Sequence, residues 1–111
     1  MVAWDPPPPD WLKLNTDGSA AGNPGTAGFR GLFRDSQGRS IIGFMRNGGH
    51  TTALAAELYA IRDGLNIAVS HHFHNVIAET DCQIAYLLFS GAPNMFHPCS
   101  TLLWVAGSFY R

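Results

Sequence analysis

The sequence predicts a layered α/β or α+β fold, because the spacing of its hydrophobic residues changes along the chain. Between residues 11 and 46, three short runs alternate apolar and polar residues and are separated by turn-forming residues. Between residues 51 and 70, apolar residues recur at helical spacing, and a fourth alternating run follows. These observations predict three antiparallel strands, a helix, a fourth strand and a second helix.

Length and composition fit one compact domain. The chain has 111 residues, 46% of them hydrophobic, which is enough for one core but not for two. A net charge of −1 argues against a protein that binds polyanions through its overall charge. No apolar run approaches the roughly 18 residues of a membrane span, and the N-terminus lacks a secretory signal. We therefore expect an intracellular protein, nuclear or cytoplasmic, that does not bind membranes.

Two segments stand apart from the predicted elements. Residues 1–10 form a proline-rich lead-in whose four consecutive prolines favour a stiff extended conformation, and residues 11–111 form the domain. The segment SHHFHN, residues 70–75, places three histidines between the helix and the fourth strand. A metal site there would need ligands that converge from elsewhere, so a polar loop is the favoured interpretation.

The first strand is predicted in WLKLNTD. Apolar and small residues alternate with polar ones, which gives one apolar face (Leu12, Leu14, Thr16) and one polar face (Lys13, Asn15, Asp17). Asp17 is expected to end this strand. The following GNPG suits a tight type II turn, because Pro24 presets φ and Gly25 tolerates a positive φ.

The second and third strands are predicted in AGFRGLFRD and SIIGFMR, joined by a hairpin turn at DSQGR. Four of the seven basic residues fall in this stretch: Arg30, Arg34, Arg39 and Arg46. They form either a patch that follows a phosphate backbone or a solvated hairpin face, and the sequence leaves both interpretations open.

The helix is predicted to run for about five turns from an N-cap at Thr51 or Thr52. Its apolar stripe consists of Leu54, Leu58, Ile61, Leu65, Ala68 and Val69. At about 100° per residue, Glu57 falls at the margin of this stripe, from which its carboxylate can reach the sheet. Asp63 falls on the outward side.

The fourth strand is predicted in NVIAETD, which ends at Asp81. A helix is expected to begin there, with Asp81 as its cap and Gly91 at its end. The apolar run TLLWVAG, beginning at residue 101, suggests a further helical piece.

Three acidic residues occupy positions from which they can meet. If the fourth strand lies beside the first, Asp17 and Asp81 become neighbours, and Glu57 lies on the helix between them. Three carboxylates in one pocket repel each other unless a cation binds, and hard oxygen ligands suit Mg²⁺ or Mn²⁺. The alternative is three unrelated surface acids, each capping a turn or a helix.

Three blocks in order, DGSAAGNPGTAGFRG, TALAAELYAIRDGL and AETD, resemble the ribonuclease H-like family, especially its plant, reverse-transcriptase-associated branch. The similarity runs from Trp11 to Leu88. The resemblance implies a mixed sheet flanked by helices, with its fourth strand parallel to the first. It also implies a carboxylate cluster that holds two divalent metal ions, Mg²⁺ or Mn²⁺, and cleavage of the RNA strand of RNA–DNA hybrids.

The resemblance also assigns residues. It places Asp17, Glu57 and Asp81 in the metal-ligand and catalytic positions. The backbone after the first aspartate and the Asn-Pro-Gly turn lie near substrate in family members, so Gly18, Ser19 and Asn23 become candidate substrate contacts.

The match departs from the family in three respects. The family uses a fourth acid on a helix after a fifth strand, but no Asp or Glu follows Asp81 here. We therefore expect the fifth strand and last helix to be missing, which would leave the fourth strand as an exposed edge. Glu79 is a candidate substitute for the missing acid. Arg30 stands where the family motif usually has glycine.

Three other functions are weighed against hybrid cleavage. A catalytically silent module that binds nucleic acid or a protein partner would keep the fold and lose turnover. A P-loop nucleotide binder lacks its Gly-Lys-Ser/Thr motif here. An aspartyl-phosphate phosphotransferase would need a second aspartate at position 19 and a downstream lysine, and neither is present.

Overall fold

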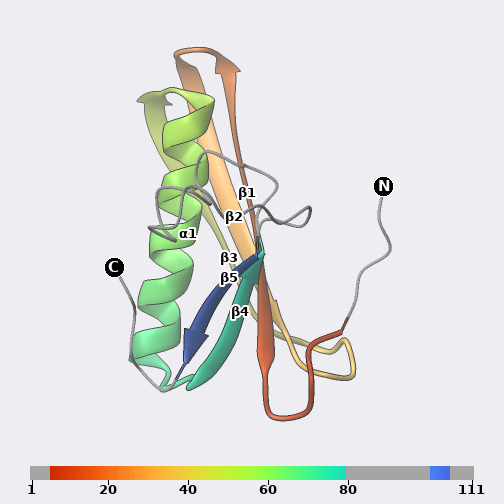
Figure 1. Cartoon of the computed structure of the whole chain (residues 1–111). Helices are drawn as coiled ribbons and strands as arrows, with labels where there is room; N and C mark the ends of the chain where they lie inside the picture. Colours follow the sequence, from red (N-terminus) through yellow and green to blue (C-terminus); the bar gives the residue numbers. More distant parts are fainter. Residues whose placement is uncertain (1–5, 80–100, 106–111) are drawn as a thin grey trace, which may run out of the picture.

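The structure is a computed structural model that describes residues 6–79 in full and residues 101–105 by their backbone alone. Its elements run in the order β1 (Leu12–Gly22), β2 (Gly25–Arg34), β3 (Ser40–Thr51), α1 (Ala53–Ser70), β4 (Asn75–Glu79) and β5 (Thr101–Val105) (Figure 1). The three antiparallel strands, the long helix and the fourth strand lie where the periodicity predicts them.

The strands form one mixed sheet in the order β3-β2-β1-β4-β5. β1 pairs antiparallel with β2 and parallel with β4, with Leu14 opposite Ala78 in the parallel register. A parallel pair needs a crossover connection, and the chain from β2 to β4, which includes β3 and α1, provides it. The predicted arrangement of the fourth strand beside the first is therefore confirmed.

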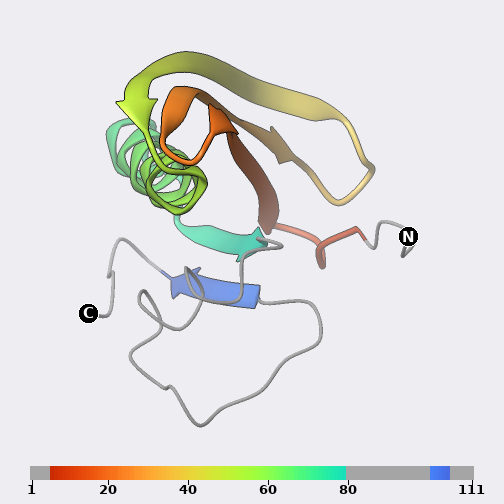
Figure 2. The ribbon, with the colours of Figure 1, turned by 90° about the horizontal axis from the view of Figure 1, so that it is seen from above.

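α1 covers one face of the sheet, and the core lies between them (Figures 1 and 2). Seven buried side chains form this core: Leu14, Phe33, Ile61, Leu65, Ala68, Val76 and Ala78. Viewed from above, β3 curves around towards the helix (Figure 2), as the twist of a sheet requires. The opposite face of β1 and β2 carries no helix among the described residues.

Two predictions about β1 are wrong. Asp17 does not end the strand, because β1 continues for five more residues to Gly22 and pairs with β2 throughout, with Gly22 opposite Gly25. Gly25 does not take the positive φ that the predicted type II turn needs, because it is paired in β2 opposite Gly22. Small residues after Asp17 continue the ladder because β2 offers a partner for every one of them.

The prediction that the fifth strand is missing is also wrong. Residues Thr101–Val105, which we predicted as helix, form β5 and pair antiparallel with β4, with Glu79 opposite Thr101. A short apolar run fits a strand or a helix equally well by its period, and the free edge of β4 offers backbone groups that a strand satisfies. The helix predicted to begin at Asp81 lies outside the described residues, which also do not test the expectation that the family's last helix is missing.

α1 begins as predicted, since the side chain of Thr52 accepts a hydrogen bond from the backbone of Ala55 at 3.1 Å. The face that it buries is rotated from the predicted one. Leu54 and Val69 are 36% and 57% exposed. The buried positions are Ala56, Ala60, Ile61, Gly64, Leu65 and Ala68, so small residues dominate the contact with the sheet.

The turn between β2 and β3 is organised by one carboxylate. The oxygens of Asp35 accept hydrogen bonds of 2.9 Å from the backbone N–H groups of Gln37 and Arg39 and from the Arg39 guanidinium. The backbone N–H of Arg39 lowers the pKa of Asp35 most. The N–H of Gln37 and the Arg39 guanidinium lower it further, whereas burial opposes them.

We predict a pH dependence from this turn. The folded pKa of Asp35 lies below its ordinary value of 3.8, so its contribution to stability is present above pH 4 and is lost as the pH falls through the lowered pKa. A titration of the Asp35 carboxyl carbon by NMR should give a midpoint below 3.8. A midpoint at or above that value in the folded protein would contradict the bonds described at the turn.

Among the described residues, no helix is both long enough and apolar enough to cross a membrane.

Candidate active site

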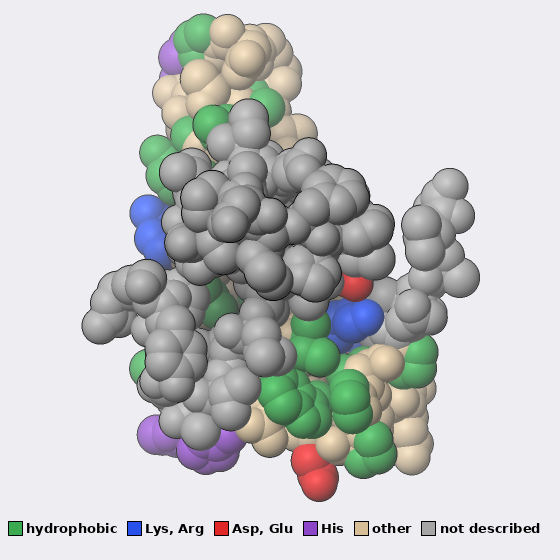
Figure 3. Space-filling model, viewed as in Figure 1, with side chains coloured by type: hydrophobic (Ala, Val, Ile, Leu, Met, Phe, Trp, Pro, Cys, Tyr) green, Lys and Arg blue, Asp and Glu red, His purple; other side chains and the backbone are tan. Residues whose placement is uncertain are grey.

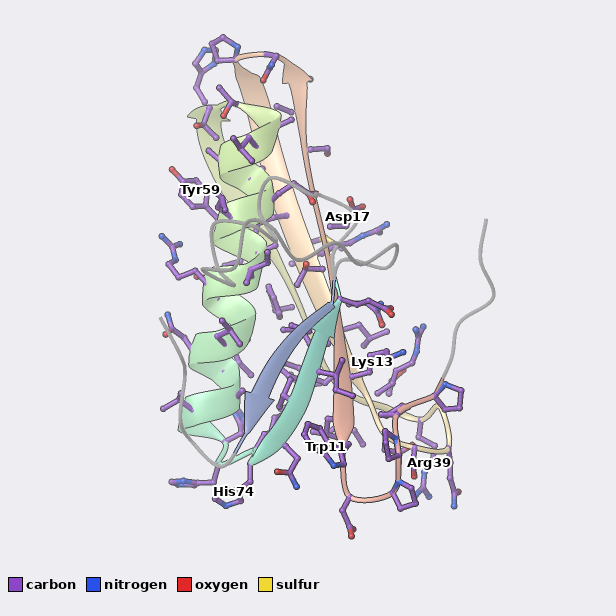
Figure 4. All side chains as sticks on the ribbon, viewed as in Figure 1. Trp11, Lys13, Asp17, Arg39, Tyr59 and His74 are labelled. Carbon is purple, nitrogen blue, oxygen red and sulfur yellow. The ribbon has the colours of Figure 1, made fainter. Side chains whose placement is uncertain are left out.

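Asp17 lies in the middle of β1, on the sheet face that points away from α1 (Figure 4). Side chains alternate along a strand, and Leu14 on the helix side is fully buried, whereas the Asp17 side chain is 64% exposed. Across the antiparallel pair, Arg30 is directly opposite Asp17. The guanidinium Nη2 of Arg30 lies 3.5 Å from Oδ2 of Asp17. The predicted polar face of β1 is confirmed, and its aspartate faces an arginine.

Glu57 reaches the same point of β1 from the helix side of the sheet. Its Oε1 accepts a hydrogen bond from the backbone N–H of Gly18, the residue that follows Asp17. The neighbours of Glu57 on its own helix face, Ala60 and Ile61, are fully buried. Glu57 therefore lies in the middle of the buried side of α1 and not at its margin, and a carboxylate from α1 meets β1 one residue from Asp17.

Gly18 makes this meeting possible. A Cβ added to Gly18 would lie 2.5 Å from the carbonyl carbon of Ala56 and 2.6 Å from the backbone nitrogen of Glu57. The backbones of β1 and α1 therefore approach more closely here than a side chain would permit. This close approach brings the Glu57 side chain within reach of the strand.

The third predicted acid, Asp81, lies outside the described residues. The parallel pairing of β1 with β4 is described as far as Asn15 opposite Glu79, and Asp81 follows Glu79 by two positions in the chain. Within residues 6–79 and 101–105, no three His, Cys, Asp or Glu side chains lie together in a way that could hold a metal ion.

The carboxylate of Glu79 is held by two neighbours on β1. Asn15 donates a hydrogen bond of 2.8 Å to Oε1, and Nζ of Lys13 lies 3.4 Å from Oε2. Lys13 is 6% exposed, and Figure 4 shows it on the same side of β1 as Asp17. The sequence analysis missed this network, although the alternation of polar residues on both strands is the signal that reveals it once their register is known.

The candidate substrate contacts fall on two surfaces. Ser19 is exposed on the helix-free face, two residues beyond Asp17, and pairs in register with Gly28. Asn23 lies in the turn between β1 and β2, where its Oδ1 accepts a hydrogen bond of 3.1 Å from the backbone N–H of Ala53. Asn23 therefore satisfies one of the free N–H groups at the start of α1, which is a structural role that the sequence did not indicate.

We predict that Asn23→Ala lowers the free energy of unfolding by about 1 kcal/mol, because the N–H of Ala53 loses its acceptor. Asn23→Asp keeps an acceptor oxygen at the same place and should retain most of the stability. Urea unfolding followed by circular dichroism measures both variants. Equal losses for alanine and aspartate would show that the capping bond contributes nothing.

The four arginines of β2, β3 and the turn between them do not form one patch. Arg46 pairs with buried Phe29 and lies on the helix side, where its Nε is 2.9 Å from Oδ2 of Asp63. Asp63 was predicted to point outward, but its side chain is only 15% exposed, because β3 curves around to meet it (Figure 2). Arg39 belongs to the Asp35 turn. Only Arg30 and Arg34 share the helix-free face of β2.

Two hollows lie on the helix-free face, with volumes of about 640 and 560 Å³. Asp17, Arg30 and Met45 line both, so the hollows meet at the Asp17–Arg30 pair. Ser19 lines the first hollow, and Arg34 and Asn15 line the second. Asp17 is therefore open to ligands from solvent on this face.

The histidines of the loop after α1 lie away from this site. Figure 3 shows histidine side chains at both the lower and the upper end of the molecule, and Figure 4 labels His74 at the lower end, well apart from Asp17. Nδ1 of His71 lies 3.1 Å from the carbonyl oxygen of Ile67, so this ring is associated with the end of the helix. These contacts support the interpretation of a polar loop.

Asp17 and Glu57 carry the kind of donor atom that a hard divalent cation uses, because carboxylate oxygens are the ligands that Mg²⁺ and Mn²⁺ prefer. Asp17 lies on the helix-free face of β1, and Glu57 reaches the backbone of the next residue from the helix side. The described residues therefore supply two of the three acids that the sequence pattern implies.

Comparison with known proteins agrees with this geometry. A family model described as "Reverse transcriptase-like" matches residues 15–108. The whole chain is 34% identical over 111 residues to a protein of Arabidopsis thaliana named "Putative ribonuclease H protein At1g65750". The chain spans only 18% of that relative's length.

Solved structures show the same fold. A crystal structure of LC11-RNase H1 in complex with an RNA/DNA hybrid matches with a TM-score of 0.68 and 24% identity, over 78% of this chain and 66% of that one. RNase H1 from the archaeon Halobacterium salinarum matches with a TM-score of 0.70 and 24% identity, over 79% and 67% of the two chains.

Proposed function

The chain belongs to the reverse transcriptase-like family of ribonuclease H-like proteins, and we propose that it binds RNA–DNA hybrids and hydrolyses their RNA strand. The observation that carries this proposal is the hydrogen bond that Glu57 accepts from the backbone N–H of Gly18, the residue after Asp17, in a sheet whose β4 runs parallel to β1. A carboxylate from the crossover helix thus reaches β1 one residue along the strand from Asp17, and the metal-dependent nuclease that we propose uses both acids.

Asp17, Glu57 and Asp81 are the proposed metal ligands and catalytic residues. The N–H of Gly18 holds Oε1 of Glu57 beside β1, which orients the carboxylate before any ligand arrives. When bound, Mg²⁺ or Mn²⁺ supplies Lewis-acid chemistry for phosphodiester hydrolysis, and two such ions are expected in the complete site. The domain that carries this site spans residues 11–111, with residues 1–10 as its lead-in.

Substrate recognition is proposed to use Gly18, Ser19 and Asn23. Ser19 presents an exposed hydroxyl two residues from Asp17, within the hollow that Asp17 lines. Asn23 keeps its amide N–H₂ for a ligand while its oxygen caps α1. Selectivity for a hybrid comes from the 2′-hydroxyl groups of one strand and the shape of the groove, and not from base sequence.

The proposal is tested by cleavage of a labelled RNA–DNA hybrid with and without Mg²⁺ or Mn²⁺. We expect metal-dependent cutting of the RNA strand alone, and Asp17→Asn should lower the rate by at least about 100-fold. Asp10→Asn makes the same chemical change ahead of β1 and serves as the matched control, with a rate close to that of the unaltered protein.

Two results would overturn the proposal: no cutting by a protein that is folded by circular dichroism, or equal cutting by Asp17→Asn. If a folded protein binds the hybrid without cutting it, the catalytically silent nucleic-acid-binding module replaces the enzyme. The guanidinium of Arg30, 3.5 Å from Oδ2 of Asp17, places a positive charge in the proposed metal site and is the observation that favours that second candidate.

A further inference from the structure

The register of the sheet places a positive charge directly against Asp17. Arg30 of β2 is opposite Asp17 of β1 in the antiparallel pair, so the two side chains emerge side by side on the helix-free face. The distance between Nη2 of Arg30 and Oδ2 of Asp17 is 3.5 Å. The guanidinium therefore neutralises part of the negative charge of Asp17 that would attract a metal ion.

This ion pair differs from two other arginine–aspartate pairs of the protein, one in the turn between β2 and β3 and one between β3 and α1. Arg39 and Arg46 each place Nε 2.9 Å from an aspartate whose side chain is only 18% or 15% exposed. The Arg30–Asp17 contact is longer than a good hydrogen bond, and both side chains are 64% exposed. An exposed, loosely held pair is weak, so a stronger cation displaces it.

The approach to Asp17 leads past Arg30. Both residues line both hollows of the helix-free face, which meet at this pair. A divalent ion such as Mg²⁺ keeps several of its waters when it binds, so it needs room beside the carboxylate. In the structure, the Arg30 guanidinium takes up part of the space beside the Asp17 carboxylate.

We infer that Arg30 sets the divalent-metal affinity of Asp17: its guanidinium pairs with the carboxylate in the metal-free protein and must be displaced before a metal ion binds. The inference rests on the proposed metal site at Asp17. Arg30 weakens metal binding in two ways, because it occupies the carboxylate and because its charge repels the ion. The metal concentration at which the site fills is accordingly raised.

The test is a calorimetric titration with Mn²⁺ in the absence of nucleic acid. Arg30→Gln keeps length and polarity, removes the charge, and should bind Mn²⁺ about 3- to 10-fold more tightly than the unaltered protein. Arg30→Lys keeps the charge and should remain close to the unaltered protein. In the Asp17→Asn background, Arg30→Gln should give no gain.

Arg34→Gln is the matched control. Arg34 lies four residues along the same strand face, about 13 Å from Arg30 at the usual rise of a strand, and lines only the second hollow. Its replacement removes the same charge from the same face. The affinity for Mn²⁺ should change by less than about twofold, because a charge at that distance is largely screened.

Three results would overturn the inference: Mn²⁺ affinity that Arg30→Gln leaves unchanged, an equal gain from Arg34→Gln, or a gain that persists without the Asp17 carboxylate. The outcome is separable from hybrid cleavage, because the titration contains no substrate. A gain that depends on Asp17 in a protein without cleavage activity would support the inference and refute the proposed enzyme. Cleavage of the hybrid by a protein whose Mn²⁺ affinity does not depend on Arg30 would support the proposed enzyme and refute the inference.

Discussion

Replacing Gly18 with alanine is expected to lower the free energy of unfolding by about 3 kcal/mol, the upper end of what overpacking usually costs. The added methyl group would lie 2.5 Å from the carbonyl carbon of Ala56 and 2.6 Å from the nitrogen of Glu57. Both are backbone atoms of α1, which no side-chain rotation can move aside. The variant must therefore push the first turns of the helix away from β1.

The same displacement should affect the site. Moving α1 away from β1 separates the Glu57 carboxylate from the N–H of Gly18, so the variant should lose metal-dependent activity even where it remains folded. Urea unfolding followed by circular dichroism measures the stability, and the cleavage assay at a temperature well below the transition measures the activity.

Gly28→Ala is the matched control for Gly18→Ala. Gly28 lies on β2 opposite Ser19, and the only close neighbour of a Cβ added there is the carbonyl oxygen of Arg46 at 3.6 Å, which is ordinary van der Waals contact. We expect its stability to change by less than about 1 kcal/mol. If Gly18→Ala were as stable as Gly28→Ala, the close packing of helix against strand would be refuted.

The first four strands and the helix could be predicted from local signals, whereas the parallel pairing of β4 with β1 was expected from the family resemblance. Alternation fixes which residues share a face, as in Leu14 on one side of β1 and Asp17 on the other. The shift to helical spacing after Thr52 requires a crossover, and a crossover helix permits β4 to lie parallel to β1. The alternation and the helical spacing depend on near neighbours in the chain.

The rotation of α1 could not be predicted in the same way. A search for large apolar residues selects Leu54 and Val69, which are exposed, and passes over Gly64. A Cβ on Gly64 would lie 2.5 Å from Cδ2 of Leu14, so the helix packs its small residues tightly on β1. Packing chooses the face that permits the closest approach, and the identity of the partner is not visible in the helix sequence.

Two interpretations were open for the four arginines, and the one that groups them in a single patch is excluded for a related reason. Nearness in the chain suggests one basic patch, but alternation and the curvature of β3 send Arg46 to the helix side, where it meets Asp63. The contact between Arg30 and Asp17 depends on the register between two strands. Register follows from the turn at Asn23 and Pro24, which places Gly22 opposite Gly25 where the sequence analysis had predicted a turn that includes Gly25.

Replacing Glu57 with glutamine is expected to lower metal-dependent cleavage by at least about 100-fold with little effect on stability. The glutamine oxygen can still accept the hydrogen bond that the Gly18 N–H donates to Glu57, so β1 and α1 remain connected. What is lost is the negative charge, and a neutral amide is a much poorer ligand for Mg²⁺ or Mn²⁺.

Asp63→Asn provides the comparison on the same helix. Asp63 is also a carboxylate that faces the sheet, but its partners are Arg46 and Arg62, and it lies six residues from Glu57 along the chain. Loss of this pairing should lower stability by about 1 kcal/mol or less and leave the cleavage rate within about threefold. A second readout, the rise in melting temperature on adding Mn²⁺, should disappear in Glu57→Gln and persist in Asp63→Asn. If both variants kept that rise, Glu57 would be a structural link between α1 and β1 and not a metal ligand. Metal binding needs the negative charge that glutamine lacks, whereas the link to Gly18 needs only an acceptor oxygen, which glutamine keeps.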